Sequence, residues 1–187
     1  MTELRADSSK TFVAHWLQLK KDKPFTSSAD FLDNPHPELA PNCIIMEIVG
    51  TSITLRLEGT DVVNRWGIDE TGKNVQFSNE PKVVHSLLRN GESMHTQPCG
   101  LRSFMELGVR TNLTLLMEVV ILPLAVEEKR PKRLVCHSAM LERGFFNDSS
   151  ARWQRTHECH WIDIGDGTPT NKPSIPPATN INRNMKD

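Results

Sequence analysis

The chain has 187 residues, with 22 basic and 23 acidic side chains and a formal net charge of -1. This length suits one domain with extensions, or two small domains. The balanced charge argues against a nucleic-acid-binding protein, which normally carries a basic patch. The apolar runs are far shorter than the roughly 20 residues that cross a bilayer, and the polar first ten residues lack the apolar core of a secretion signal. We therefore expect a cytoplasmic protein that binds neither nucleic acid nor membrane.

The four cysteines are widely spaced and form no C-x-x-C pair: Cys43, Cys99, Cys136 and Cys159. In a chain of this length such spacing predicts reduced thiols in the core rather than a disulfide framework.

Apolar residues at helical spacing predict a helix over residues 11–20. Phe12, Trp16 and Leu19 share one face of it, and a possible serine cap precedes it. Residues 24–41 contain several prolines and predict an irregular linker. We therefore assign residues 1–42 to an N-terminal helix and a linker.

From Cys43 onward the hydrophobic pattern has a period of two. Residues 43–49 and 52–58 predict a hairpin with a tight turn at Gly50-Thr51. A short helix is predicted next, over residues 61–66 with Gly67 at its end.

A second helix around residues 83–88 is predicted to follow Pro81 and to end at Asn90-Gly91. Three further strands are predicted over residues 93–105, 112–122 and 133–141.

Together these elements predict an α+β fold: a five-stranded antiparallel sheet with helices on one face, plus the N-terminal helix. Residues 43–145 would form this domain, and residues 146–187 a C-terminal extension. From about residue 165 the extension carries almost no apolar side chain, so we expect it to be disordered.

Several short motifs then follow one another in a fixed order, namely His15-Trp16-Leu17, Leu55-Arg56-Leu57-Glu58-Gly59-Thr60, Gly67-Ile68-Asp69-Glu70-Thr71-Gly72, and Met117-Glu118 through Leu122-Pro123-Leu124. In this order and spacing they resemble the PAS-like family common in alphaproteobacteria. In that family an N-terminal helix with a Trp precedes an arginine-bearing strand and a Gly-x-Asp/Glu-x-Thr-Gly motif. The resemblance covers roughly residues 10–145.

The resemblance implies a bacterial sensory or interaction fold. PAS domains bind a small molecule between sheet and helices, or dimerise through the outer sheet face and an N-terminal helix. The motifs of a kinase, cyclase or DNA-binding output are absent from the sequence, so signalling would act through an unidentified protein partner. We expect a sensory adaptor without an output domain of its own. The alternatives are a pure homodimerisation or scaffold module without a ligand, and a haem-binding sensor.

A ligand cavity of this kind would be lined by apolar residues of the sheet and the helices: Ile53, Leu55, Trp66, Phe77, Val84, Leu88, Leu115 and Met117. The alternative is that these residues form a dry core. His85 is a further candidate ligand, because the axial histidine of haem-carrying PAS domains comes from a helix in this region; otherwise it is an exposed or satisfied histidine. The sequence has no Asn-Cys-Arg photoadduct motif of a flavin domain, and the cofactor stays open.

The predicted outer face of the sheet is half apolar, since Leu116, Val120 and Leu122 flank Glu118 there. Such a face needs a cover, either the N-terminal helix or a second subunit, and we predict a homodimer. Arg56 points to the same face, where it is solvated or pairs with Glu118 or a partner's acid.

No catalytic or metal site is predicted. The Gly-x-Ser-x-Gly elbow, the phosphate loop and the dinucleotide motif are all absent from the sequence. His157, Cys159 and His160, with Cys136-His137 elsewhere in the chain, invite a zinc interpretation. Close neighbours on a strand or helix point apart, however, and no fourth ligand is specified. We therefore expect a binding protein rather than an enzyme.

Overall fold

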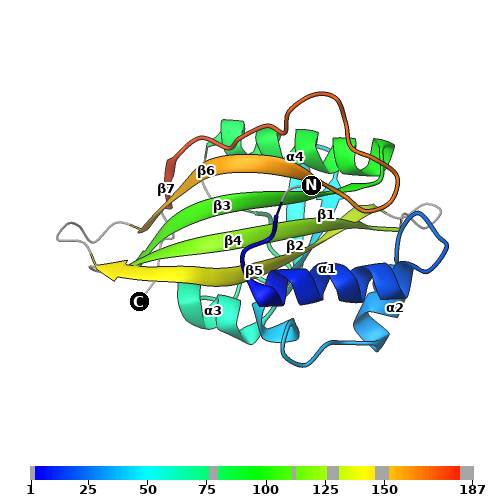
Figure 1. The fold of residues 1–187 in the computed structure, drawn as a ribbon. Coiled ribbons are helices and arrows are strands. Elements are labelled where there is room, and N and C mark those ends of the chain that lie inside the picture. Colours follow the sequence, from blue (N-terminus) through cyan, green and yellow to red (C-terminus); the bar gives the residue numbers. More distant parts are fainter. Residues whose placement is uncertain (1–2, 76–79, 111–112, 126–130, 146–151, 182–187) are drawn as a thin grey trace.

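The computed structural model describes residues 3–75, 80–110, 113–125, 131–145 and 152–181. Its centre is an antiparallel sheet of seven strands, curved into a half-barrel, in the order β2-β1-β5-β4-β3-β6-β7 (Figure 1). The strands are β1 (Cys43–Val49), β2 (Ser52–Glu58), β3 (Cys99–Arg110), β4 (Leu113–Leu124), β5 (Lys132–Phe145), β6 (Arg152–Asp163) and β7 (Thr179–Ile181). The helices are α1 (Asp7–Lys20), α2 (Ser28–Asp33), α3 (Thr60–Trp66) and α4 (Pro81–Thr96), with a short 3-10 turn, η1, at Ala40–Asn42.

The expected five-stranded sheet with helices on one face is therefore wrong in both respects. Strand β6 extends the sheet by pairing along β3, and β7 pairs with the start of β6. The sequence conceals β6 because a register shift opposite Phe104 and Met105 interrupts its alternation. A long partner strand with an open edge, rather than the local pattern, makes this segment a strand.

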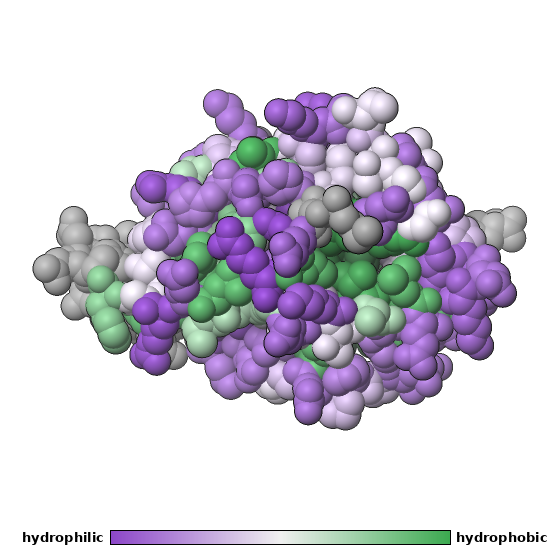
Figure 2. Space-filling model, in the orientation of Figure 1, coloured by the Kyte–Doolittle hydropathy of each residue, from purple (hydrophilic) through white to green (hydrophobic). Residues whose placement is uncertain are grey.

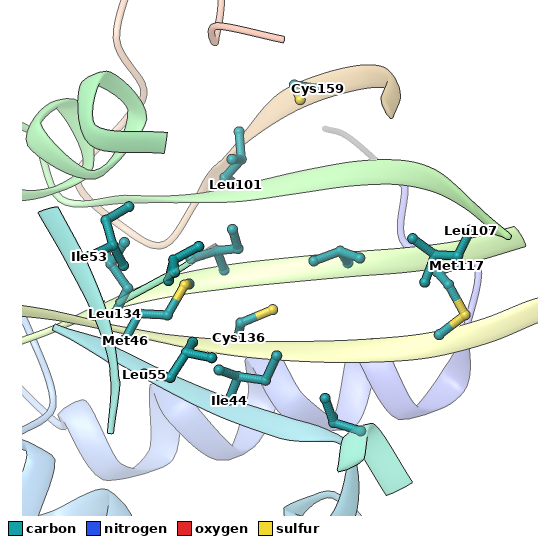
Figure 3. Close-up of a cluster of buried hydrophobic side chains, with 14 of the residues drawn as sticks. Ile44, Met46, Ile53, Leu55, Leu101, Leu107, Met117, Leu134, Cys136 and Cys159 are labelled. Carbon is teal, nitrogen blue, oxygen red and sulfur yellow. The ribbon is translucent and has the colours of Figure 1, made fainter. Parts of the chain in front are cut away.

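Helices cover both faces of the sheet (Figure 1). Helices α3 and α4 lie on the inner face, over the cluster of buried side chains drawn in Figure 3. Helix α1 lies on the outer face, where Phe12 and Trp16 are fully buried in a second cluster with Val120 and Leu122. The N-terminal helix thus covers this half-apolar face, and Figure 2 shows the apolar surface around it framed by polar residues.

The start of α1 is held by the buried carboxylate of Glu118 on β4, which is 0% exposed. Its Oε1 accepts a hydrogen bond from the backbone N–H of Arg5 and its Oε2 one from that of Ala6, both at 2.9 Å. The guanidinium Nε of Arg102 lies 3.8 Å from Oε1. Arg56, which the sequence offered as a partner for Glu118, instead forms an ion pair with Glu47 at 2.9 Å.

The predictions from local sequence are correct where the residues that contact each other are close in the chain. The hairpin of β1 and β2 is confirmed, and so is α3, whose last turn is closed by Gly67 with a φ of 71°. Helix α4, in contrast, runs through the predicted stop at Asn90-Gly91 to Thr96. A Cβ at position 91 would lie 2.7 Å from the Ile48 side chain, so glycine serves close packing of α4 on β1 rather than helix termination.

Residues 164–178, which we call the strap, run along β6 and α4 to β7 (Figure 1). The sequence predicted disorder here. The structure instead pairs Ser174 with Asn90 of α4 twice: the Asn90 amide donates to the Ser174 carbonyl, and the Ser174 N–H donates to Asn90 Oδ1, both at 2.8 Å. The buried Asn90 amide thus satisfies both the backbone N–H and the backbone carbonyl of Ser174, as a neighbouring strand would in a sheet.

All four cysteines are buried and unpaired, as the sequence predicted, and burial raises the pKa of each thiol to about 12. Among the described residues, no helix has the length and apolar character needed to cross a membrane.

Replacing Glu118 with Ala would leave two backbone N–H groups without their buried acceptor and would remove the carboxylate that lies 3.8 Å from the Arg102 guanidinium. We expect E118A to lower the free energy of unfolding by about 3 kcal/mol, and E118Q, which keeps one acceptor oxygen, by about half as much. Urea unfolding measures both. The exposed control E38Q should change stability by less than about 0.5 kcal/mol; a similar loss in E38Q and E118A would contradict the anchoring role.

Candidate functional site

An apolar cavity of about 90 Å³ lies between the inner face of the sheet and helices α3 and α4. Its walls come from β1, β3, β4, β5, β6, both helices and the strap. Figure 3 shows several of the wall residues together: Ile44, Met46, Leu107, Met117 and Cys136. A space between the sheet and the helices is where the sequence placed a ligand.

The strap closes one side of this cavity with Pro176. Pro176 follows Ser174 by two residues, so the Asn90–Ser174 pair fixes the strap beside the opening. A further contact joins the Ser174 and Ser86 hydroxyls at 3.1 Å. The part of the strap beside the cavity is thus held by hydrogen bonds to α4. Earlier in the strap, Asn171 accepts a hydrogen bond from the Trp161 indole of β6 and Ile164 accepts one from Lys20 of α1.

Three polar side chains reach the cavity wall, those of Arg65, Ser138 and Gln154. Arg65 of α3 is the largest of them, and it donates to Ser138 Oγ at 3.0 Å and to Asn42 Oδ1 at 2.6 Å. Burial lowers the pKa of Arg65, and the nearby carboxylate of Asp61 opposes that effect. Two fixed acceptors therefore hold this guanidinium in one place.

Arg65 and Ser138 also line a second space, an open groove of about 800 Å³. The groove runs along the outer half of β5, with the first residues of α1 and the residues of α3 in its walls. The same two side chains therefore separate the cavity from the groove, and a shift of Arg65 would alter both spaces.

His137 of β5 lies at the groove and is only 1% exposed. Its ring stacks on Phe12 of α1 with a centroid distance of 5.3 Å. Its Nδ1 finds no hydrogen-bond partner among the described residues. Burial, followed by the charge of Arg65, lowers the pKa of His137 to about 4, and Glu118 opposes this only in part. The imidazole is therefore neutral at pH 7 and leaves a buried polar atom unused beside an open groove.

The predicted wall residues are only partly brought together. Trp66 and Met117 line the cavity. Ile53 and Leu55 are buried in the same core without reaching it, and Leu115 lines the groove. Phe77 lies outside the described residues.

On α4 the prediction is shifted by one residue. Val84 is half-buried and Leu88 packs at the margin of the core, whereas Val83 and Leu87 line the cavity. The adjacent pairs of apolar residues leave the rotation of the helix undecided. Burial of Asn90 and Met94 selects the face that contains Val83.

His85 is exposed on α4 and lines a shallow depression with Ile175 and Pro177 of the strap. It does not line the cavity. His157 and His160 are also exposed, while Cys159 between them belongs to the inner core. Within the described residues no three acidic, histidine or cysteine side chains gather as a metal site would require.

The site residues that sequence reasoning missed are polar: Arg65 and Ser138, and also His137, which it weighed only as a zinc ligand. A search for apolar pocket residues does not consider polar side chains. In the sequence, Arg65 is typical of a solvent-exposed charged residue on a short helix. The one available signal was a histidine at position 137 within an apolar strand, next to Cys136.

Comparison of the chain with protein-family models, with curated proteins and with solved structures gave no match. The resemblance to the PAS-like family thus stays a prediction, and function has to be argued from the site itself.

The depressed pKa of His137 makes stability depend on pH. Above pH 6.5 the His137 ring is neutral in both the folded and the unfolded state. As the pH falls toward 4, the ring binds a proton in the unfolded chain but stays neutral in the folded protein. The free energy of unfolding therefore decreases between these two pH values. Between pH 7 and 4.5 we expect the wild type to lose about 2 kcal/mol more than H137L. Urea unfolding at both values measures this difference. The exposed control H85Q should retain the wild-type pH dependence, and equal losses in wild type and H137L would refute the assignment.

Proposed function

We propose that the protein is a cytoplasmic sensory adaptor that binds a small apolar molecule and relays its presence to a protein partner. The observation that carries this proposal is the apolar cavity between sheet and helices, closed on one side by the strap. The motif resemblance to PAS-like domains supports the same role, although the sheet has seven strands.

The size and lining of the cavity favour a small apolar ligand. Its volume of about 90 Å³ is well below the roughly 300 Å³ at which pockets for drug-sized ligands begin. Met46, Met105 and Met117 lie in its wall, and flexible thioether side chains adapt to guests of different shape. A dry cavity of this kind holds molecules of the size of xenon or benzene.

The route from the cavity to the surface is the Arg65–Ser138 contact. Both residues face the cavity and the groove, and the groove also contains Ala6 and Asp7 at the start of α1. A ligand that binds more tightly when Arg65 takes one position than another would favour that position, and with it one arrangement of the groove and of the start of α1. The size of this population shift is set by the difference in ligand affinity between the two arrangements.

The alternative is a homodimeric scaffold without a ligand. Helix α1 already covers the face on which the sequence placed the dimer contact, so that reason no longer applies. The end of β5 supports a contact instead, because Met140 is 58% exposed and Phe145 is 78% exposed. Native mass spectrometry separates the two functions: added mass that leaves on denaturation indicates a ligand, and a clean apo dimer indicates the scaffold.

Xenon tests the cavity directly. In protein labelled at the methionine methyl groups, we expect dissolved xenon to shift the resonances of Met46, Met105 and Met117, because their side chains line the cavity. Met140 is exposed and serves as the internal control. V83L and V119I each add a methylene at the wall and should reduce the shifts. Shifts that are equal at Met140, or that persist in both variants, would rule out the cavity as the binding site.

The strap should open when its partner on α4 is removed. N90A deletes both hydrogen bonds to Ser174, so we expect amide exchange over residues 170–178 to accelerate at least roughly tenfold while β4 stays protected. Hydrogen exchange with mass spectrometry measures both. The control S86A keeps both bonds between Asn90 and Ser174. It loses the contact between the Ser86 and Ser174 hydroxyls and the Ser86 hydrogen bond to the Lys82 carbonyl within α4, so it should show a smaller change. Equal acceleration in the two variants would contradict the role of Asn90.

A further inference from the structure

We infer that the groove beside β5 is a docking slot for an extended, basic segment of a partner protein, which adds to the free edge of β5 as a further strand. The inference concerns the outer surface and does not depend on a ligand in the cavity.

The free edge begins where β1 ends. Strand β1 pairs with β5 only from residue 132 to the Cys43–His137 pair, whereas β4 pairs with β5 as far as Phe145. Beyond His137 the described backbone of β5 is therefore paired on one side only. Before Cys43 the chain continues as η1, which contacts β5 where the Asn42 carbonyl accepts a hydrogen bond from the Ser138 hydroxyl. Among the described residues, no strand continues the line of β1 beside residues 139–145 of β5.

The strands at the two ends of the sheet have neighbours over part of their length. Residues 72–75 bond to the backbone of β2, with contacts such as Val75 N–H to the Ile53 carbonyl. The start of β6 is paired with β7, and the strap flanks the rest of that strand. The outer half of β5, in contrast, faces the groove.

The groove has the shape of a slot for one strand. Residues 138–141 and Arg143 of β5 lie along it, the first turn of α1 forms part of one wall, and α3 contributes Asp61, Asn64 and Arg65. Six residues of β5 correspond to roughly 20 Å of extended chain. Main-chain hydrogen bonds would supply affinity, as in other peptide complexes that extend a sheet.

The charges around the slot specify the partner. Exposed carboxylates of Asp7, Glu38 and Asp61 line its end next to α1 and α3, and the exposed guanidinium of Arg143 lines it further along β5. Asp7 already pairs with Lys10 at 2.9 Å, and Asp61 accepts a hydrogen bond from the Asn42 amide at 2.9 Å. No basic side chain of the described residues forms an ion pair with Glu38 or Asp61. Arg65 is engaged by Asn42 and Ser138. Basic side chains of a docked segment would therefore complete the slot, and acidic ones would be repelled.

The inner end of the slot holds a buried acceptor. His137 is 1% exposed, lies at the groove and has no partner for Nδ1 among the described residues. In one tautomer Nδ1 accepts a hydrogen bond, so a donor on the incoming segment would satisfy it. Natural sheets protect such edges with bulges and charges, and here the bulge at Leu141 and the charges of Glu142 and Arg143 limit pairing to complementary segments.

The test uses a fluorescein-labelled octapeptide of alternating Lys and Val, with two counter-probes: alternating Glu and Val, and a Lys-Val peptide interrupted by proline. We expect the Lys-Val peptide to bind in fluorescence polarisation and both counter-probes to bind at least tenfold more weakly. The double variant E38Q/D61N should weaken Lys-Val binding at least tenfold, while D33N, which removes an exposed acid on α2, should leave it unchanged. V83L, which fills the cavity, should also leave it unchanged, so that this test and the xenon test can fail separately.

Amide hydrogen exchange locates the bound peptide. Protection should rise within residues 138–143 and stay constant in β2 and β6. The inference is overturned if the Lys-Val peptide fails to bind at millimolar concentration, if it binds equally well to E38Q/D61N, or if protection appears at another edge.

Discussion

The capture of two backbone N–H groups by the buried Glu118 carboxylate organises the outer half of the molecule. A fully buried charge is stable only when its hydrogen bonds are made, so the chain before α1 must lie against β4. That position sets Phe12 over His137 and brings Ala6 and Asp7 to the groove. The covered outer face, the neutral histidine and one wall of the slot all follow from this contact.

The inner half is organised around space rather than charge. Close packing of α4 on β1 at Gly91 and of apolar side chains on the sheet leaves a small cavity. The strap covers it through hydrogen bonds between Ser174 and the side chains of Asn90 and Ser86. Interiors are normally filled to the density of organic crystals. The walls of this apolar space, beside a segment held by few hydrogen bonds, are therefore the part of the core that can rearrange with the smallest loss of packing free energy.

Arg65 joins the two halves. It is buried enough for its pKa to fall, is held by Asn42 and Ser138, and borders both the cavity and the groove. A ligand that binds in the cavity and a segment that docks in the groove would both contact or displace this side chain. The proposed sensing role and the proposed docking slot remain separate, since each has its own test, but the geometry allows them to be coupled.

Local sequence patterns were enough to predict the features that depend on near neighbours: the β1–β2 hairpin, the glycine-capped α3, the apolar stripe of α1 and the alternating faces of β4. They also indicated a ligand space between sheet and helices and the need to cover the face that carries Glu118. Long-range contacts decide the rest: the strands β6 and β7, the path of the strap, which of Val83 and Val84 faces inward, and the meeting of Arg65 with His137 and Ser138. These features depend on partners that are distant in the chain. The local hydrophobic periodicity of a segment does not specify which distant strand edge, amide or carboxylate that segment will contact.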